Sequence, residues 1–196
     1  MSNIVNQLSS VQNLVLEIQK IERNHTLPNT DTQENVALHS FSIAILAWKI
    51  HSLIDSKLSI EKILKYALVH DFLEKWLSKD INAFADEEER KIKIKNEEKV
   101  LKELQSNYND FPDMIQMIEW YESMRDEEAQ FVYIIDKMQA IILWKIDNWR
   151  PYKKINIRYE AFSAKIDSYL SKCPDELIWI YKEIINDAKI TFYDQP

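Results

Sequence analysis

The chain has 196 residues, of which 46% are hydrophobic and 29% are charged, and its formal net charge at pH 7 is −7. This length allows one domain with a sizeable core, and the negative charge disfavours binding to DNA or RNA duplexes, which favour clustered Lys and Arg. The sequence contains no Gly, which excludes a Walker loop and a dinucleotide-binding fingerprint and argues against a hairpin-rich β fold. We therefore expect a single all-α domain over residues 1–196.

The N-terminal residues combine neither a basic region nor a long apolar region, so we expect no secretory signal. No uninterrupted apolar run approaches the length of a membrane span. Cys173 is the single cysteine, and we interpret it as an incidental or half-buried thiol without a catalytic role. These features predict a soluble, cytoplasmic protein without a membrane partner.

In the first half of the chain, apolar residues recur at the spacing of helices. Residues 23–32 contain Asn, Pro and Asp and are predicted to form a loop. Ser59 is predicted to cap a helix that carries a carboxylate in its first turn. The predicted helices run from about Val5 to Glu22, from Thr32 to about Ile54, and from Ser59 through His70 to about Leu77.

The second half continues this helical pattern. Residues 86–104 are dense in Glu and Lys, which is typical of a solvated helix, although a partner surface is the alternative. Pro112 suits the first position of a helix. Further helices are predicted over residues 114–124, from Asp126 to about residue 144 or 148 before Pro151, and over about 157–170 and 175–190. The prediction is a bundle of six to eight helices, in which the last segment, about 151–196, packs on the core or forms a dimer surface.

Four polar side chains lie on or beside apolar faces of three predicted helices: His39, His70, Asp71 and Asp136. A buried charge is costly unless it is paired or bound to a metal, and two imidazoles with two carboxylates suit one divalent ion. The ion (Mn, Co, Zn, Mg or Fe) would keep positions open for water. For each residue alone, a hydrogen-bonded core side chain is the simpler interpretation, and only their combination favours a metal site.

The order His, His-Asp, Asp resembles the HD superfamily of metal-dependent phosphohydrolases, and more narrowly the HD-domain 5′-deoxyribonucleotidase family. The resemblance covers about residues 20–148. The supporting strings are Glu34 to Ala37 before His39, Ala67 to Asp71 followed by Glu74, Trp120 to Glu122, and Phe131-Val132 with Asp136-Lys137. It implies an HD-domain helical bundle in which His39, His70, Asp71 and Asp136 bind the metal.

The resemblance also implies roles for other residues. Glu74 resembles the family's catalytic glutamate, and Arg23 resembles its phosphate-binding arginine. Asp80 takes the place of a sugar-contacting aspartate, although it comes one residue late and without the preceding Gly. Lys75 and Lys137 are interpreted as solvated helix lysines, and His51 is not expected to be a ligand.

The prediction for function is a metal-dependent phosphohydrolase, foremost a 5′-nucleotidase that acts on (deoxy)nucleoside 5′-monophosphates. A dNTP triphosphohydrolase or a phosphodiesterase on a small nucleotide is the alternative among enzymes. A non-catalytic nucleotide-binding or oligomerising helical protein is the alternative from another class. The expected partners are a small phosphorylated substrate and, by family analogy, a second copy of the chain in a homodimer.

Overall fold

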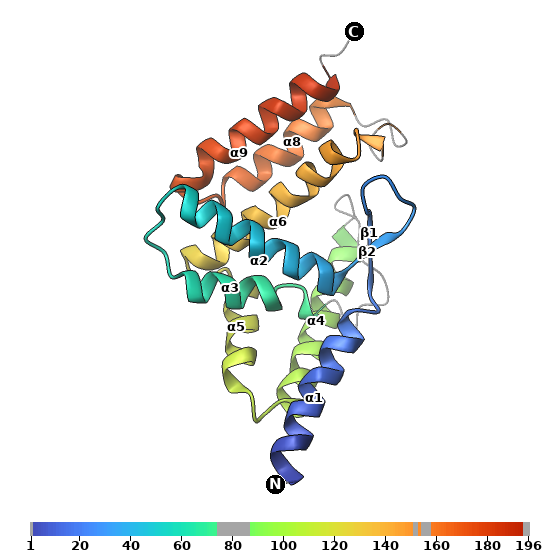
Figure 1. The fold of residues 1–196 in the computed structure, drawn as a ribbon, viewed down its shortest axis with the longest axis vertical. Coiled ribbons are helices and arrows are strands. Elements are labelled where there is room, and N and C mark those ends of the chain that lie inside the picture. The colour runs from blue at the N-terminus through green and yellow to red at the C-terminus, as the bar shows by residue number, and fades with distance from the viewer. Residues whose placement is uncertain (1, 74–86, 151–152, 154–157, 194–196) are drawn as a thin grey trace.

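The computed structural model describes residues 2–73, 87–150, 153 and 158–193, and within these ranges it is a helical fold with one two-stranded sheet (Figure 1). The helices and strands, in chain order, are α1 (Ser2–Ile18), β1 (Glu22–Thr26), β2 (Gln33–Asn35), α2 (Val36–Leu53), α3 (Ile60–Val69), α4 (Glu87–Asn107), α5 (Pro112–Glu122), α6 (Glu127–Ile146), α8 (Tyr159–Leu170), α9 (Asp175–Ala188) and the short π-helix η2 (Lys189–Tyr193). The predicted all-α class, with six to eight α-helices, is confirmed.

The centre of the fold is formed by α2, α3 and α6, each of which packs against the other two. Their contact surfaces are apolar, with Ile43 of α2, Ile63 of α3 and Ile135 of α6 fully buried. In addition, α5 packs on α3 and α9 packs on α6. Figure 1 shows α8 and α9 at the end of the molecule near the C-terminus, and α1 at the opposite end. The three central helices are therefore the rigid elements on which a site can be built.

The two short strands form an antiparallel hairpin beside the start of α2. The sequence pattern predicted a loop over residues 23–32 and a helix from Thr32. The loop is confirmed over residues 27–32, but residues 23–26 belong to β1, and the helix begins only at Val36, after β2. Glu22 pairs with Asn35 and Thr26 pairs with Gln33 in the observed register. The segment contains no apolar alternation, so its pairing depends on backbone bonds between residues distant in sequence, which local periodicity does not report.

Asn35 is the junction between the hairpin and α2. Its backbone is extended, at φ −94° and ψ 158°, and its side-chain oxygen accepts a hydrogen bond from the amide of Leu38 at 2.9 Å. An extended residue whose side chain satisfies an amide of the first turn is a helix N-cap. The strand therefore ends and the helix begins at one residue, which fixes Glu34 and His39 relative to each other.

The third predicted helix ends earlier than expected. Ser59 caps its start as predicted, accepting from the amide of Lys62, but the helix stops at Val69 and His70 is its C-cap residue. The prediction that this helix continues is therefore wrong for residues 70–73. The rest of the predicted continuation, to Leu77, lies outside the described ranges. The turn after Val69 places His70 and Asp71 at the end of the helix.

Three helices end in a left-handed residue although the chain has no Gly. The residues are Asp55 after α2, Met124 after α5 and Asn148 after α6, at φ 50°, 48° and 50°. In each case the amide of the following residue reaches back to a carbonyl in the last turn: Ser56 to His51, Arg125 to Trp120 and Trp149 to Trp144. This is the Schellman arrangement, which most often uses Gly at the left-handed position.

Helix α2 has two faces of different character. One face is buried and carries His39, Ile43 and Ala47. The other carries an exposed apolar stripe, made of Leu38, Phe41, Ile45 and Trp48, which are between 39% and 60% exposed. Within the described residues, α2 is the helix that is long and apolar enough to cross a membrane by length and composition, and core helices of soluble proteins pass the same criterion.

Candidate metal centre

His39 lies one turn into α2 and is fully buried. Its Nε2 atom is 3.0 Å from Oδ1 of Asp136 on α6, and its Nδ1 atom is 3.4 Å from Oε2 of Glu34. Burial lowers the pKa of His39, but the contacts with Asp136 and Glu34 outweigh it and raise the pKa to about 9. Both ring nitrogens thus face carboxylates, which attract positive charge to this position.

His70 approaches the same point from the end of α3, and its ring centroid is 5.1 Å from that of His39. Its Nδ1 atom lies 2.9 Å from the carbonyl oxygen of Ala67. A carbonyl can only accept, so Nδ1 donates and the lone pair is on Nε2. Burial lowers the pKa of His70, so the ring is neutral, and its buried Nε2 has no hydrogen-bond partner within the described residues. A metal ion is the partner that such a nitrogen suits.

Asp136 brings a carboxylate from the buried face of α6. Its Oδ1 atom faces His39, and its Oδ2 atom accepts a hydrogen bond from Lys137. Burial alone would raise the pKa of Asp136, but the charge of Lys137 and the contact with His39 hold it well below the usual range. Lys137 is part-buried against this carboxylate, so its interpretation as a solvated helix lysine is wrong.

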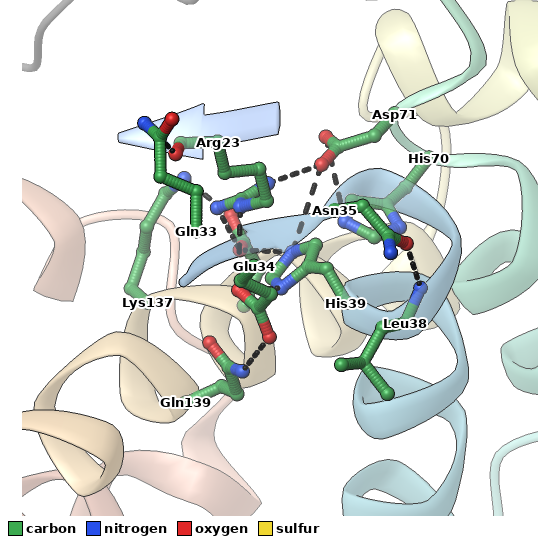
Figure 2. Close-up of polar contacts among 11 residues, drawn as sticks. Arg23, Gln33, Glu34, Asn35, Leu38, His39, His70, Asp71, Lys137 and Gln139 are labelled. Carbon is green, nitrogen blue, oxygen red and sulfur yellow. Dashed lines mark hydrogen bonds and ion pairs between the residues drawn. The ribbon is translucent and has the colours of Figure 1, made fainter. Parts of the chain in front are cut away.

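Asp71, next to His70, completes the group with Arg23 from β1 (Figure 2). Oδ1 of Asp71 lies 3.4 Å from Nε2 of His70, and Oδ2 lies 3.6 Å from Nε2 of His39. Oδ2 also accepts a hydrogen bond from the guanidinium of Arg23, which in turn lies 3.8 Å from Oδ1 of Asp136. The arginine therefore contacts the same carboxylates that face the two imidazoles.

Glu34 is a buried residue of this site to which the sequence pattern assigned no role. Its Oε1 atom accepts a hydrogen bond from Gln139 at 3.0 Å, and its Oε2 atom lies 3.4 Å from Nδ1 of His39 and 3.6 Å from Nε of Arg23 (Figure 2). Carboxylates that hold the second nitrogen of a metal-binding histidine fix the orientation of its ring. The signal in the sequence was the position of this carboxylate five residues before His39, directly before Asn35, a residue type that favours helix starts.

The residues present fit a divalent ion. Ligand atoms of His39, His70 and Asp136, all three buried, lie within 4.8 Å of one another. An ion that binds both imidazoles takes the place of the proton that the raised pKa of His39 favours. With both rings then neutral, the three carboxylates Glu34, Asp71 and Asp136 face the two cations Arg23 and Lys137. The cluster then keeps a net negative charge in a buried place, which favours binding of a cation.

The structure thus brings together five residues that the sequence selected: Arg23, His39, His70, Asp71 and Asp136. Glu74 and Asp80 lie outside the described residues. His51, which was not expected to be a ligand, lies near the other end of α2. Its Nε2 atom is within hydrogen-bonding distance, 3.0 Å, of the carbonyl oxygen of Leu58.

Comparisons with known proteins show which family and which solved structures this chain is similar to. A family model described as an HD domain matches residues 16–177. A solved structure described as a predicted metal-dependent phosphohydrolase, from Magnetospirillum magnetotacticum, is 20% identical with a TM-score of 0.79, and the match covers 100% of this chain and 97% of that one. An HD-domain phosphohydrolase from Listeria innocua is 18% identical with a TM-score of 0.66, and the match covers 93% of this chain and 90% of that one.

A protein from Pyrococcus horikoshii is 21% identical with a TM-score of 0.62, and the match covers 94% of this chain and 99% of that one. At these identities, the likeness to solved structures shows a common fold. None of the curated proteins compared matches this chain. The family match includes every described residue of the metal cluster, from Arg23 to Asp136.

Proposed function

This chain belongs to the HD domain family, and on that basis we propose that it is a metal-dependent phosphohydrolase acting on a small phosphorylated substrate. The observation that carries the proposal is the buried group of His39, His70 and Asp136, whose ligand atoms lie within 4.8 Å of one another. Two solved structures of the same fold are described as phosphohydrolases, which agrees with this assignment.

In the proposed centre, His39, His70, Asp71 and Asp136 hold one divalent ion. A bound ion of this kind lowers the pKa of a coordinated water and polarises a phosphoryl oxygen. The residues of the chain provide the positioning. The carbonyl of Ala67 orients the ring of His70, and Lys137 holds one oxygen of Asp136 so that the other faces His39.

Arg23 and Glu74 are proposed to act on the substrate. Arg23 lies beside Asp71 and Asp136, and a guanidinium can hold a phosphate through two parallel hydrogen bonds. Glu74 follows His70 by four residues in the sequence, and we propose that it transfers the proton as the general acid or base. Asp80 is proposed to contact the sugar, as the resemblance implies.

Nucleoside 5′-monophosphates are the first substrates to test, and nucleoside triphosphates are the alternative. The decisive experiment supplies purified, Mn²⁺-loaded protein with deoxynucleoside mono-, di- and triphosphates and identifies the product. Release of inorganic phosphate from a monophosphate supports a 5′-nucleotidase, whereas release of tripolyphosphate from a triphosphate supports the alternative. No hydrolysis of any substrate by metal-loaded protein would favour a non-catalytic nucleotide-binding protein.

Metal binding is tested separately from turnover. His70→Ala is expected to lower the affinity for Mn²⁺ in titration calorimetry by at least about tenfold, because it removes a buried ligand. His51→Ala is the matched control, since His51 bonds to the carbonyl of Leu58, and it should bind Mn²⁺ like the wild type. Equal affinities in both variants would refute the proposed centre.

The role of Glu74 has its own test. Glu74→Ala should lower kcat by about 10²–10⁴-fold, the usual contribution of a general acid or base. The variant should still bind one Mn²⁺ per chain, because Glu74 is not among the proposed ligands. Turnover at the wild-type rate would show that another group transfers the proton.

A further inference from the structure

Next to Asp136, two lysines and two tyrosines of α6 and α8 lie close to Lys172, which is in the turn after α8. We call them the lysine–tyrosine cluster: Tyr133, Lys137, Lys165, Tyr169 and Lys172. The rings of Tyr133 and Tyr169 meet edge to face, with 6.1 Å between their centroids. Tyr133 and Lys137 are one turn apart on α6, so they project from the same side of that helix. The tyrosine pair therefore joins α6 to α8 and forms the base of the cluster.

The ammonium groups of the lysines lie over these rings. Nζ of Lys137 is 5.0 Å from the ring centroid of Tyr133 and 5.9 Å from that of Tyr169. Nζ of Lys172 is 5.1 Å from the ring of Tyr133, and Nζ of Lys165 is 5.4 Å from the ring of Tyr169. The tyrosine rings therefore position the ammonium groups through cation–π contacts. Because these groups cover the ring faces, the rings do not offer a surface on which a nucleotide base could stack.

The cluster is continuous with the metal centre through Lys137. This lysine donates to Oδ2 of Asp136, whose Oδ1 lies 3.0 Å from Nε2 of His39. Asp136 also acts electrostatically on both tyrosines. A group bound beside Lys137 would therefore be a direct neighbour of a group bound at the metal.

The charges of the cluster indicate the class of ligand. The whole chain has a net charge of −7, yet three ammonium groups gather at this place. Lys137 shares a carboxylate with the metal centre. Lys172 is exposed and forms no ion pair with a carboxylate in the part of the chain that the structure describes. A local concentration of positive charge beside a hydrolytic centre attracts an anion.

We propose that the lysine–tyrosine cluster binds a second phosphate group of the substrate. Lys172 would contact this phosphate and so produce the preference for it. This inference rests on the proposed function and adds to it a preference for substrates with at least two phosphates over the 5′-monophosphate. The reacting phosphate lies at the metal centre and the second lies against Lys137 and Lys172, where ammonium groups act as point charges toward phosphate oxygens. The two phosphates are either adjacent, as in a nucleoside 5′-diphosphate, or on separate sugar oxygens, as in a nucleoside 3′,5′-bisphosphate.

The first test compares substrates with the Mn²⁺-loaded full chain. We expect kcat/KM to be at least about tenfold higher for a nucleoside 5′-diphosphate or 3′,5′-bisphosphate than for the 5′-monophosphate, and the larger value identifies the arrangement of the phosphates. Lys172→Ala should lower this preference about tenfold, as expected for the loss of one charged hydrogen bond. Lys182→Ala, which removes an exposed lysine of α9, is the charge-matched control and should keep the preference.

The second test needs no turnover, so it separates this inference from the proposed function. Binding of an α,β-methylene nucleoside diphosphate, of a nucleoside 3′,5′-bisphosphate and of the 5′-monophosphate is measured by calorimetry with Mn²⁺ present. Tighter binding of either two-phosphate compound that Lys172→Ala removes and Lys172→Arg restores would support the cluster even if no substrate is hydrolysed. Equal affinity for all three compounds, or equal losses in Lys172→Ala and Lys182→Ala, would overturn the inference.

Discussion

Glu34 shows how much of the candidate centre depends on a residue that does not itself bind the ion. Its carboxylate lies 3.4 Å from Nδ1 of His39 and also contacts Arg23 and Gln139. Burial would raise the pKa of Glu34, but the contact with His39 and the charge of Arg23 lower it, so the group is ionised. It is therefore able to hold the His39 ring in one orientation.

Replacing this carboxylate should weaken metal binding. Glu34→Gln keeps the size of the side chain but removes its charge, and we expect the affinity for Mn²⁺ to fall by about 10–100-fold. Competition with a fluorescent chelator measures the change. Glu22→Gln, at an exposed position of β1, is the matched control, and an equal loss in that variant would show that Glu34 has no specific role.

Cys173 provides a pH-dependent prediction away from the site. Burial raises the pKa of its thiol to about 11, and the charge of Asp175 acts in the same direction. The thiolate is the reactive form, so the folded protein should react with iodoacetamide slowly at pH 8, and the rate should keep rising toward pH 11. Mass spectrometry follows the labelling. The same protein in urea is the control, and equal rates for the folded and unfolded chain at pH 8 would contradict the prediction.

At the level of single residues, the ligands could be predicted because each is a polar group inside an apolar run. His39 and Asp136 interrupt stripes that are otherwise apolar, and both are buried. The role of Lys137 could not be predicted in this way. Its contact with Tyr169 crosses from α6 to α8, and a pairing between helices distant in the sequence is set by tertiary packing.

At the level of elements, the three glycine-free helix ends contain local strain that can be tested. A left-handed conformation costs a residue with a side chain about 1–2 kcal/mol. Met124 adopts it after α5, at φ 48°. Glycine removes that cost and returns about 0.5–1 kcal/mol as entropy of the unfolded chain.

Met124→Gly is therefore expected to raise the free energy of unfolding by about 0.5 kcal/mol. Gln116→Gly, at an exposed position inside the same helix, should lower it by about 1 kcal/mol. Urea denaturation followed by circular dichroism measures both. If Met124→Gly is as destabilising as Gln116→Gly, the left-handed residue is not strained.

The helices were predictable because each buries one face, so the apolar period of its sequence reports its packing. The ends of the helices were less predictable where side-chain caps and tertiary contacts determine them. Helix α2 begins at Val36 and not at the predicted Thr32, because β2 pairs with β1 and Asn35 caps the helix. The end of α3 moved to Val69, and the turn that follows carries His70 and Asp71 into the centre.

At the level of the whole molecule, the exposed apolar stripe of α2 supports the expected homodimer. Leu38, Phe41, Ile45 and Trp48 recur at intervals of three and four residues, which is the spacing of a helix–helix seam. A second copy could place the same stripe against it, since twofold interfaces use one surface on both partners. We expect the purified chain to be a dimer at micromolar concentration.

Light scattering coupled to gel filtration checks the molar mass. The double variant Phe41→Glu and Trp48→Glu should be monomeric, because it places two charges in each half of the seam. Trp179→Glu changes an equally exposed tryptophan on α9 and should remain dimeric. A monomeric wild type, or a double variant that still dimerises, would contradict this assignment.

The two faces of α2 have one further consequence. His39 points into the metal centre from the buried face, and the stripe lies on the opposite face of the same helix. Coupling between two binding events is reciprocal in free energy. In the expected dimer, the factor by which dimerisation changes the affinity for the ion equals the factor by which the ion changes the affinity between the subunits. A dimer dissociation constant measured with and without Mn²⁺ would therefore give the coupling between the two faces of α2 without any substrate.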